Sequence, residues 1–156
     1  MNVTIKPGEP AKLDEYLEIF KDSPLWDHYF SGGDTTLTES LGRCLEEGTV
    51  FIAESSSGEA VGLMQCEWNG MFGEWPYLAL LGVKKNCRGM GIGGRLIDMF
   101  EATGKALGAR NLFICVSGFN PRAKALYTRR GYKKIALVPD LYKNGIEENV
   151  LMKRIG

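Results

Sequence analysis

The sequence of 156 residues carries no excess of charge of either sign. Its 19 lysines and arginines balance 19 aspartates and glutamates, and the formal net charge is zero. Proteins that bind nucleic acid through its phosphates usually present a basic surface, so we expect no nucleic-acid partner. No apolar run approaches the roughly 20 residues that span a bilayer, so we expect no membrane partner. Residues 1–8 lack the apolar stretch of a secretion signal, which predicts a cytoplasmic protein.

Histidine and paired cysteines are also scarce. His28 is the single histidine, and the four cysteines (Cys44, Cys66, Cys87 and Cys115) form no C-x-x-C pair. A structural zinc site needs a closer group of ligands, so we expect no metal. Isolated cysteines without a secretion signal suit a reducing compartment, and we interpret all four as structural. The length suits one domain over residues 1–156, with a core that needs neither metal nor disulfide.

Hydrophobic periodicity predicts an α/β protein with a mixed sheet. Helices are expected near residues 13–20, 25–30, 36–47 and 91–107, and from Asn120 to Gly131. Strands are expected at residues 3–6, 50–54, 60–68, 75–83, 112–116, 135–138 and 149–153. Asn69-Gly70 has the composition of a hairpin turn. The strands at 75–83 and 112–116 are joined through a helix, so they should be parallel with a right-handed crossover.

The most informative segment is the glycine-rich run at residues 88–94, which follows a buried strand and opens the long helix. Glycines let a backbone approach a ligand closely, and a helix start offers unpaired N–H groups and the positive end of the helix dipole. Together they predict an anion site suited to phosphate. Lys84, Lys85, Arg88 and Arg95 would add positive charge there. The alternative is a turn that only connects a strand to a helix.

Two other glycine-rich motifs also bind phosphate. The run G-x-x-x-x-G-K-[ST] of a P-loop does not occur. Gly89, Gly91 and Gly94 satisfy G-x-G-x-x-G, the dinucleotide fingerprint. That fingerprint also needs an acidic residue at the end of the next strand, where this chain has Ser117-Gly118. A dinucleotide-binding oxidoreductase is therefore an alternative of low weight.

At these residues the chain resembles the GNAT superfamily of N-acetyltransferases. The family motif R/Q-x-x-G-x-G/A is matched from Arg88 to Gly93, and Leu81-Gly82-Val83 ends the strand before it. The later pattern N-x-x-A-x-x-L-Y-x-x-x-G-[FY] is matched from Asn120 to Tyr132. The resemblance implies a central mixed sheet with two splayed parallel strands, flanked by helices on both faces. It also implies acetyl-CoA as co-substrate and direct transfer of acetyl to a primary amine.

The resemblance further implies which residues serve the reaction. Tyr127 would protonate the leaving thiolate, and the alternative is that it is only a core aromatic. Asn120 would contact the co-substrate, or only cap its helix. A main-chain N–H of the strand end would stabilise the thioester oxygen. The residues expected to bind the co-substrate are Leu81, Gly82, Val83, Arg88, Gly89, Met90, Gly91, Ile92, Gly93, Gly94 and Asn120.

The general base and the amine acceptor are less well indicated. Some family members carry a glutamate in the strand at 112–116, where this chain has Cys115, so Glu67 and Glu74 become the catalytic candidates. Aromatic residues (Trp26, Tyr29, Phe30, Trp68, Trp75 and Tyr77) could wall an acceptor pocket, and Asp27 and Asp34 could attract a cation. The acceptor could be a small molecule or a peptide. A non-catalytic acyl-CoA sensor is the other alternative, and a homodimer is possible.

Overall fold

The computed structural model describes residues 1–33 and 35–156. Asp34, expected among the acids on the acceptor side, lies outside the described residues. Two compact units contain the rest of the chain. The first comprises residues 1–66 and 80–100, and the second comprises residues 67–79 and 101–156. Each unit is described by itself.

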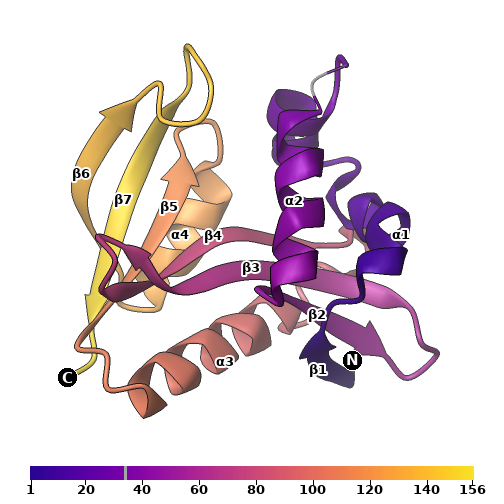
Figure 1. The fold of residues 1–156 in the computed structure, drawn as a ribbon, viewed down its shortest axis with the longest axis horizontal. Coiled ribbons are helices and arrows are strands. Elements are labelled where there is room, and N and C mark those ends of the chain that lie inside the picture. The colour runs from indigo at the N-terminus through magenta and orange to yellow at the C-terminus, as the bar shows by residue number, and fades with distance from the viewer. Residues whose placement is uncertain (34) are drawn as a thin grey trace. The chain divides into compact units, whose positions relative to one another are not determined.

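The first unit is built on an antiparallel ladder. β1 (Val3–Pro7) pairs with β2 (Val50–Ser55), which pairs with the start of β3 (Ala60–Met71). The helices of this unit are α1 (Leu13–Leu17), α2 (Thr36–Glu47) and the first part of α3 (Ile92–Ala106). As Figure 1 shows, α1 and α2 lie on one side of β3, and α3 begins on the other.

Glycines in the first unit mark where helices pack closely on strands. A Cβ on Gly62 of β3 would come within 2.9 Å of Ile92 and 3.3 Å of Leu96 on α3. A Cβ on Gly8, just after β1, would lie 2.6 Å from Leu45 of α2. Close packing at native density is what makes these positions intolerant of added volume. Helices therefore pack closely against this ladder from both sides.

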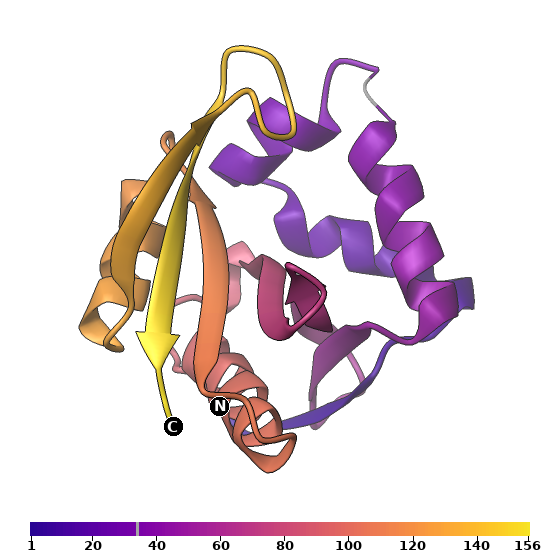
Figure 2. The same cartoon turned by 60° about the vertical axis from the view of Figure 1, so that its left-hand side comes forward.

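The second unit is a β-sheet with α4 (Pro121–Arg129) and the last residues of α3. β5 (Asn111–Ser117) pairs with β7 (Glu147–Arg154), and β7 pairs with β6 (Lys133–Pro139) at the edge. α4 contacts β5. Figure 2 shows β5, β7 and β6 side by side. One sheet face carries a cluster of Tyr77, Phe113 and Val150.

The hydrogen-bonded strand order is β1-β2-β3-β4-β5-β7-β6, and β4 (Trp75–Val83) runs parallel to β5. The predicted mixed sheet with a parallel central pair is thus confirmed. The described register of β4 and β5 contains only two pairs, Tyr77 with Phe113 and Leu78 with Ile114. β4 continues to Val83 and β5 to Ser117 beyond those pairs.

The predicted turn at Asn69-Gly70 is wrong. β3 continues to Met71, and the chain reverses at Phe72-Gly73, where both residues have positive φ (59° and 72°). Two consecutive positive φ values are what a tight hairpin turn needs. Gly70 instead serves the strand, because a Cβ there would lie 2.9 Å from Glu67 and 3.2 Å from Tyr77. The glycine permits close approach of neighbouring chain segments rather than a turn.

Most other expected elements are present with shifts of one or two residues at their ends. The expected helices at 13–20 and 25–30 are more irregular than the pattern indicates. Only Leu13–Leu17 is α-helical, flanked by 3-10 turns at Pro10–Lys12 and Glu18–Phe20, and Trp26–Phe30 forms a π-helical turn. Among the described residues, no helix has the length and apolarity needed to cross a bilayer.

Candidate active site

The glycine segment forms an irregular loop between β4 and α3. After Val83 the chain makes a 3-10 turn at Lys85–Cys87, and α3 begins at Ile92. Gly89 and Gly91 both have positive φ, 78° and 81°. Only glycine adopts this conformation without steric cost, so two positions of the motif are explained by the backbone.

The space around these two glycines is open. A Cβ built on Gly89 or Gly91 would meet no atom within 4 Å. Packing therefore does not require glycine here, and a ligand can approach the backbone. The first intrahelical bond of α3 runs from the Arg95 amide to the Gly91 carbonyl at 3.1 Å. The amides of Ile92, Gly93 and Gly94 precede it and have no partner within the helix, as at any helix start. This geometry suits a phosphate group.

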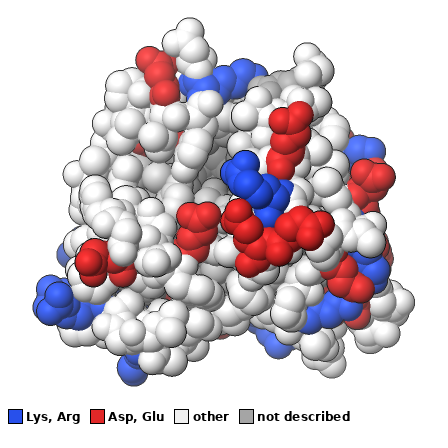
Figure 3. Space-filling model, viewed as in Figure 1, with Lys and Arg blue, Asp and Glu red and all other residues white. Residues whose placement is uncertain are grey.

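Positive side chains contribute less to the loop than the sequence indicates. Arg95 donates from its guanidinium to the Val3 carbonyl at 2.7 Å. Lys84 is paired with Glu59, which raises the pKa of the lysine. Of the four predicted basic side chains, Arg95 and Lys84 are thus engaged elsewhere, while main-chain amides and the dipole of α3 remain as positive features of the loop. On the face shown in Figure 3, acidic and basic side chains lie interspersed.

The end of β4 is shaped by a close contact with the Phe20 ring. A Cβ on Gly82 would lie 2.3 Å from the ring, an impossible distance. Leu81, Gly82 and Val83 are all half-buried. The next amide, that of Lys84, donates to the Val61 carbonyl at 2.8 Å. Gly82 is therefore required by packing, and its place in the strand end is set by Phe20.

Asn120 caps α4, as one of its two predicted roles requires. Its side-chain oxygen accepts from the Ala123 amide at 3.3 Å, and Pro121 occupies the first turn. Such a cap satisfies one of the unpaired amides of the helix start. The cap is confirmed, and contact with the co-substrate stays a prediction.

Tyr127 lies on α4 and is buried, with 4% of its surface exposed. Its ring meets Tyr132 edge to face, with centroids 6.3 Å apart. Burial raises the pKa of Tyr127 above its ordinary value, because the phenolate would lose its hydration. The hydroxyl therefore keeps its proton at neutral pH, as a proton donor must.

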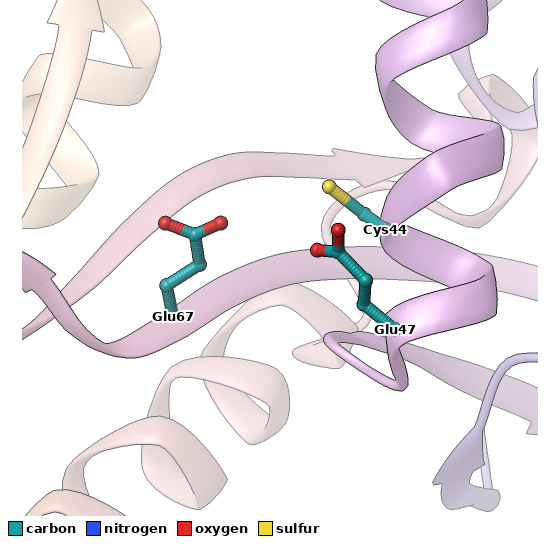
Figure 4. A group of neighbouring side chains, drawn as sticks. All are labelled: Cys44, Glu47 and Glu67. Carbon is teal, nitrogen blue, oxygen red and sulfur yellow. The ribbon is translucent and has the colours of Figure 1, made fainter.

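The two glutamates named as candidate bases occupy different surroundings. Glu67 is half-buried on β3, and Figure 4 shows its carboxylate beside the strand, with Cys44 and Glu47 on α2. Glu74 is exposed in the turn before β4, where its amide donates to the Met71 carbonyl at 3.1 Å. Burial is the main cause that raises the pKa of Tyr142, and the Glu67 carboxylate adds a smaller contribution. The structure thus favours Glu67 over Glu74 as a group facing other polar side chains.

A polar cluster that the sequence did not reveal lies in the second unit. Tyr77 of β4 hydrogen-bonds through its hydroxyl to Tyr142, in the loop between β6 and β7. The thiol of Cys115 on β5 interacts with Tyr77, and burial raises its pKa. Burial also raises the pKa of Tyr77, and raises that of Tyr142 to about 12. All three groups are therefore neutral at physiological pH.

Glu148 belongs to the same face as this cluster. It is 3% exposed on β7 and pairs in register with Ser117, while Val150 pairs with Cys115. Alternate residues of a strand share a face, so Glu148 and Val150 point to the same side. Its charge acts on both Cys115 and Tyr142. The sequence predicts a strand at residues 149–153, and extending that strand by one residue toward the N-terminus would have included Glu148. No comparable signal marks Tyr142, which follows no periodic pattern.

The aromatic residues expected to wall an acceptor pocket separate into two groups. In the first unit, Phe30 stacks on Phe20 with centroids 5.2 Å apart and on Trp26 at 5.8 Å, and Tyr29 is buried. In the second unit, Trp75 and Tyr77 belong to the cluster with Phe113. Both groups contribute to cores, and a role toward an acceptor stays a prediction.

Comparisons with known proteins agree with this geometry. Residues 13–132 match the family model described as the acetyltransferase (GNAT) family. A blasticidin-S acetyltransferase of Streptomyces morookaense is 35% identical over 86 residues, which cover 53% of this chain and 59% of the relative. An uncharacterised N-acetyltransferase of Methanocaldococcus jannaschii is 31% identical over 108 residues, 67% of this chain and 65% of the relative. The chain thus spans about three fifths of the length of these relatives.

Solved structures share the fold at low identity. A GNAT acetyltransferase structure from Desulfovibrio desulfuricans has a TM-score of 0.80 at 15% identity, covering 99% of this chain and all of that chain. The NatC complex bound to a Gag peptide and CoA has a TM-score of 0.74 at 18% identity, covering 100% of both chains. With the family match over most of its length, this protein belongs to the GNAT family of acetyltransferases.

Proposed function

We propose that this protein is an N-acetyltransferase of one domain that moves acetyl from acetyl-CoA directly to the primary amine of a small molecule or peptide. The observation that carries the proposal is the loop at residues 88–94. Two glycines with positive φ open it to a ligand, and the start of α3 supplies amides for a diphosphate. Family membership supports acetyl-CoA as the donor.

The proposed binding residues follow from this loop and from the family pattern. Residues 89–94 hold the diphosphate through main-chain amides, and the main chain of Leu81, Gly82 and Val83 pairs with the pantetheine amides like a neighbouring strand. One amide of that strand end stabilises the thioester oxygen as charge develops. Asn120 contacts the co-substrate in addition to its cap.

The proposed chemistry is a direct transfer. The neutral amine attacks the thioester carbon, the carbon–sulfur bond breaks, and the amine proton passes to a base. Glu67 is the preferred base, directly or through water, and Glu74 is the alternative. Tyr127 donates its proton to the leaving thiolate. Holding both reactants together supplies much of the rate enhancement.

The acceptor is proposed to be cationic before it loses its proton. Glu67 and Glu148 act on the pKa of Tyr142 after the larger effect of burial, and carboxylates at these positions would favour an ammonium group. The names of related proteins support both acceptor classes, a small molecule for the blasticidin-S enzyme and a peptide for the NatC complex. We infer a small-molecule or peptide amine without choosing between them.

The test is a measurement of coenzyme A release over a panel of polyamines, amino acids, aminoglycosides and peptides, with calorimetric binding of acetyl-CoA and NAD alongside. Acetyl-CoA binding with turnover of at least one amine is the expected result. Binding without turnover across the panel would favour the acyl-CoA sensor. Binding of NAD in preference to acetyl-CoA would overturn the proposal.

A further inference from the structure

The guanidinium of Arg88, the first residue of the family motif, is directed at protein carbonyls. Its Nε donates to the Val83 carbonyl at 3.1 Å. Its two terminal nitrogens lie 3.5 and 3.4 Å from the carbonyl oxygen of Asp22, 66 residues away in the chain. The rigid fork of an arginine can serve two acceptors at once, which a lysine ammonium on a flexible stem does less well.

The backbone of Asp22, which accepts this contact, has an unusual conformation. Its φ is 59°, a left-handed conformation that residues other than glycine rarely adopt. Backbone in this region persists where surrounding contacts determine it. The contact from Arg88 is one of these. Another such contact lies at the neighbouring residue. The Ser23 hydroxyl donates to the Phe20 carbonyl and accepts from the Trp26 amide at 3.2 Å.

Asp22 is the second residue of a segment, residues 21–31, that includes the π-helical turn Trp26–Phe30. Within it Trp26 stacks on Phe30, and the Lys21 ammonium lies 5.7 Å from the Trp26 ring centre. Phe30 in turn stacks on Phe20, the ring that presses on Gly82 of β4. The segment is therefore attached to the strand end and the glycine loop by two contacts, one aromatic and one through Arg88.

We propose that Arg88 is a positioning residue that couples the glycine loop to residues 21–31. Its backbone belongs to the loop, and its side chain holds the carbonyls of Val83 and Asp22. Binding of a diphosphate by the loop restrains Arg88 and, through it, the Trp26–Phe30 turn. Because Trp26, Tyr29 and Phe30 of this turn are among the aromatic residues expected to wall an acceptor pocket, acetyl-CoA binding prepares that wall. That last step rests on the proposed function.

The experiment compares wild type, Arg88→Lys and a control, Arg43→Lys, by amide hydrogen exchange with and without coenzyme A. Arg43 is an exposed arginine of α2 that contacts Ser40 and Glu47. Arg88→Lys keeps the charge and loses the fork. We expect amides of residues 21–31 to exchange about tenfold faster in Arg88→Lys, as for a locally destabilised region, and no change in Arg43→Lys.

Coenzyme A should slow exchange of residues 21–31 in wild type and in Arg43→Lys, and should fail to do so in Arg88→Lys. Coenzyme A affinity by calorimetry should change less than about threefold, because the amides remain. With an amine found by the panel, KM for the amine should rise more than KM for acetyl-CoA. Arg88→Gln, which retains one donor for Val83, serves as a second variant if Arg88→Lys does not fold.

Two results would overturn the proposal. The first is unchanged exchange of residues 21–31 in the ligand-free Arg88 variants. The second is a loss of coenzyme A affinity above tenfold with unchanged exchange, which would assign the guanidinium to the phosphate. If wild type binds no coenzyme A, the proposed function fails, while the ligand-free comparison still decides whether Arg88 holds the segment.

Discussion

Gly91 and Gly58 share a backbone conformation but lie in different loops. Their φ values are 81° and 87°, and a Cβ on either would meet no atom within 4 Å. We expect Gly91→Ala and Gly58→Ala to lose similar stability, about 1–2 kcal/mol, from the left-handed conformation alone. Only Gly91 lies in the proposed phosphate loop. Gly91→Ala should therefore weaken acetyl-CoA binding about tenfold or more, measured by calorimetry. Equal affinity in the two variants would contradict the assigned role of the loop.

Tyr127 can be tested against its neighbour Tyr132. Tyr127→Phe should lower kcat about 100-fold, within the usual contribution of a general acid, with little change in KM for acetyl-CoA. Tyr132→Phe removes a hydroxyl that bonds Glu101 at 3.4 Å and should leave kcat nearly unchanged. Since burial raises the pKa of Tyr127, its ionisation should not lower the rate below about pH 10, the ordinary tyrosine pKa. A fully active Tyr127→Phe enzyme would remove the proposed acid.

Single residues were predictable where a local signal fixes them. The positive φ of Gly89 and Gly91 and the cap of Asn120 follow from glycine and asparagine chemistry in a short stretch of chain. The contact of Arg88 with Asp22 and the bond between Tyr77 and Tyr142 join residues 66 and 65 positions apart in sequence. No periodicity encodes such contacts, because they arise from tertiary packing.

At the scale of elements, variants of Asn120 at the start of α4 can distinguish a role in capping the helix from a role in binding the co-substrate. Asn120→Ala should cost about 1 kcal/mol of stability through loss of the cap, and Asn120→Asp should retain most of it. If Asn120 also contacts the co-substrate, both variants should raise KM for acetyl-CoA, since an aspartate cannot donate from its side chain. Denaturant unfolding and steady-state kinetics measure the two effects. Unchanged KM in Asn120→Asp would leave the cap as its whole function.

The contact between Gly82 and Phe20 makes a second prediction at this scale. Gly82→Ala should destabilise the protein by about 1–3 kcal/mol, because the added methyl overlaps the Phe20 ring. Phe20→Leu frees space at the same point, so the double variant should be more stable than the sum of the two single effects predicts. Urea unfolding of the four proteins measures the coupling. Strict additivity would show that the two residues do not press on each other.

Elements with strong end signals were predicted well, and those shaped by packing were not. α2 ends at Gly48, and α4 begins at Asn120-Pro121, as the capping patterns indicate. The composition of Asn69-Gly70 predicts a turn at the wrong place, because Gly70 is needed for close approach to Tyr77 within the strand. The chain reverses at Phe72-Gly73 instead. The π-helical turn at Trp26–Phe30 likewise has no pattern of its own.

At the scale of the molecule, three buried tyrosines with raised pKa values predict alkaline unfolding. Burial raises the pKa of Tyr77, Tyr127 and Tyr132 above the value of about 10 expected in the unfolded chain. The unfolded state therefore loses protons first as the pH rises. Their stabilisation is complete below pH 10 and falls above it by about 1.4 kcal/mol per pH unit for each tyrosine.

Urea midpoints between pH 7 and pH 11.5 measure this loss. The midpoint should stay level to about pH 10 and then drop, with a shallower drop in Tyr77→Phe. A midpoint that stays level to pH 11.5 would contradict the burial of these hydroxyls.

The fold as a whole was within reach of the sequence because the βαβ crossover and the glycine loop obey general rules. The parallel pairing of β4 with β5 confirms that reasoning. The electrostatics of the loop were less predictable. Arg95 and Lys84 lie close to it in sequence, yet they serve Val3 and Glu59. Long side chains choose partners in space, which the order of residues does not record.

The cysteines differ in exposure, which allows one of them to be labelled chemically. Cys44, Cys66 and Cys87 are buried, whereas Cys115 keeps partial exposure next to Tyr77. Burial raises the pKa of the Cys115 thiol, so maleimide or fluorinated reagents should modify it slowly at pH 7 and faster near pH 9, still below the onset of alkaline unfolding. A fluorine label there would give a resonance sensitive to anything that settles near the tyrosine pair. Acceptor compounds could then be found by spectroscopy before any turnover is known.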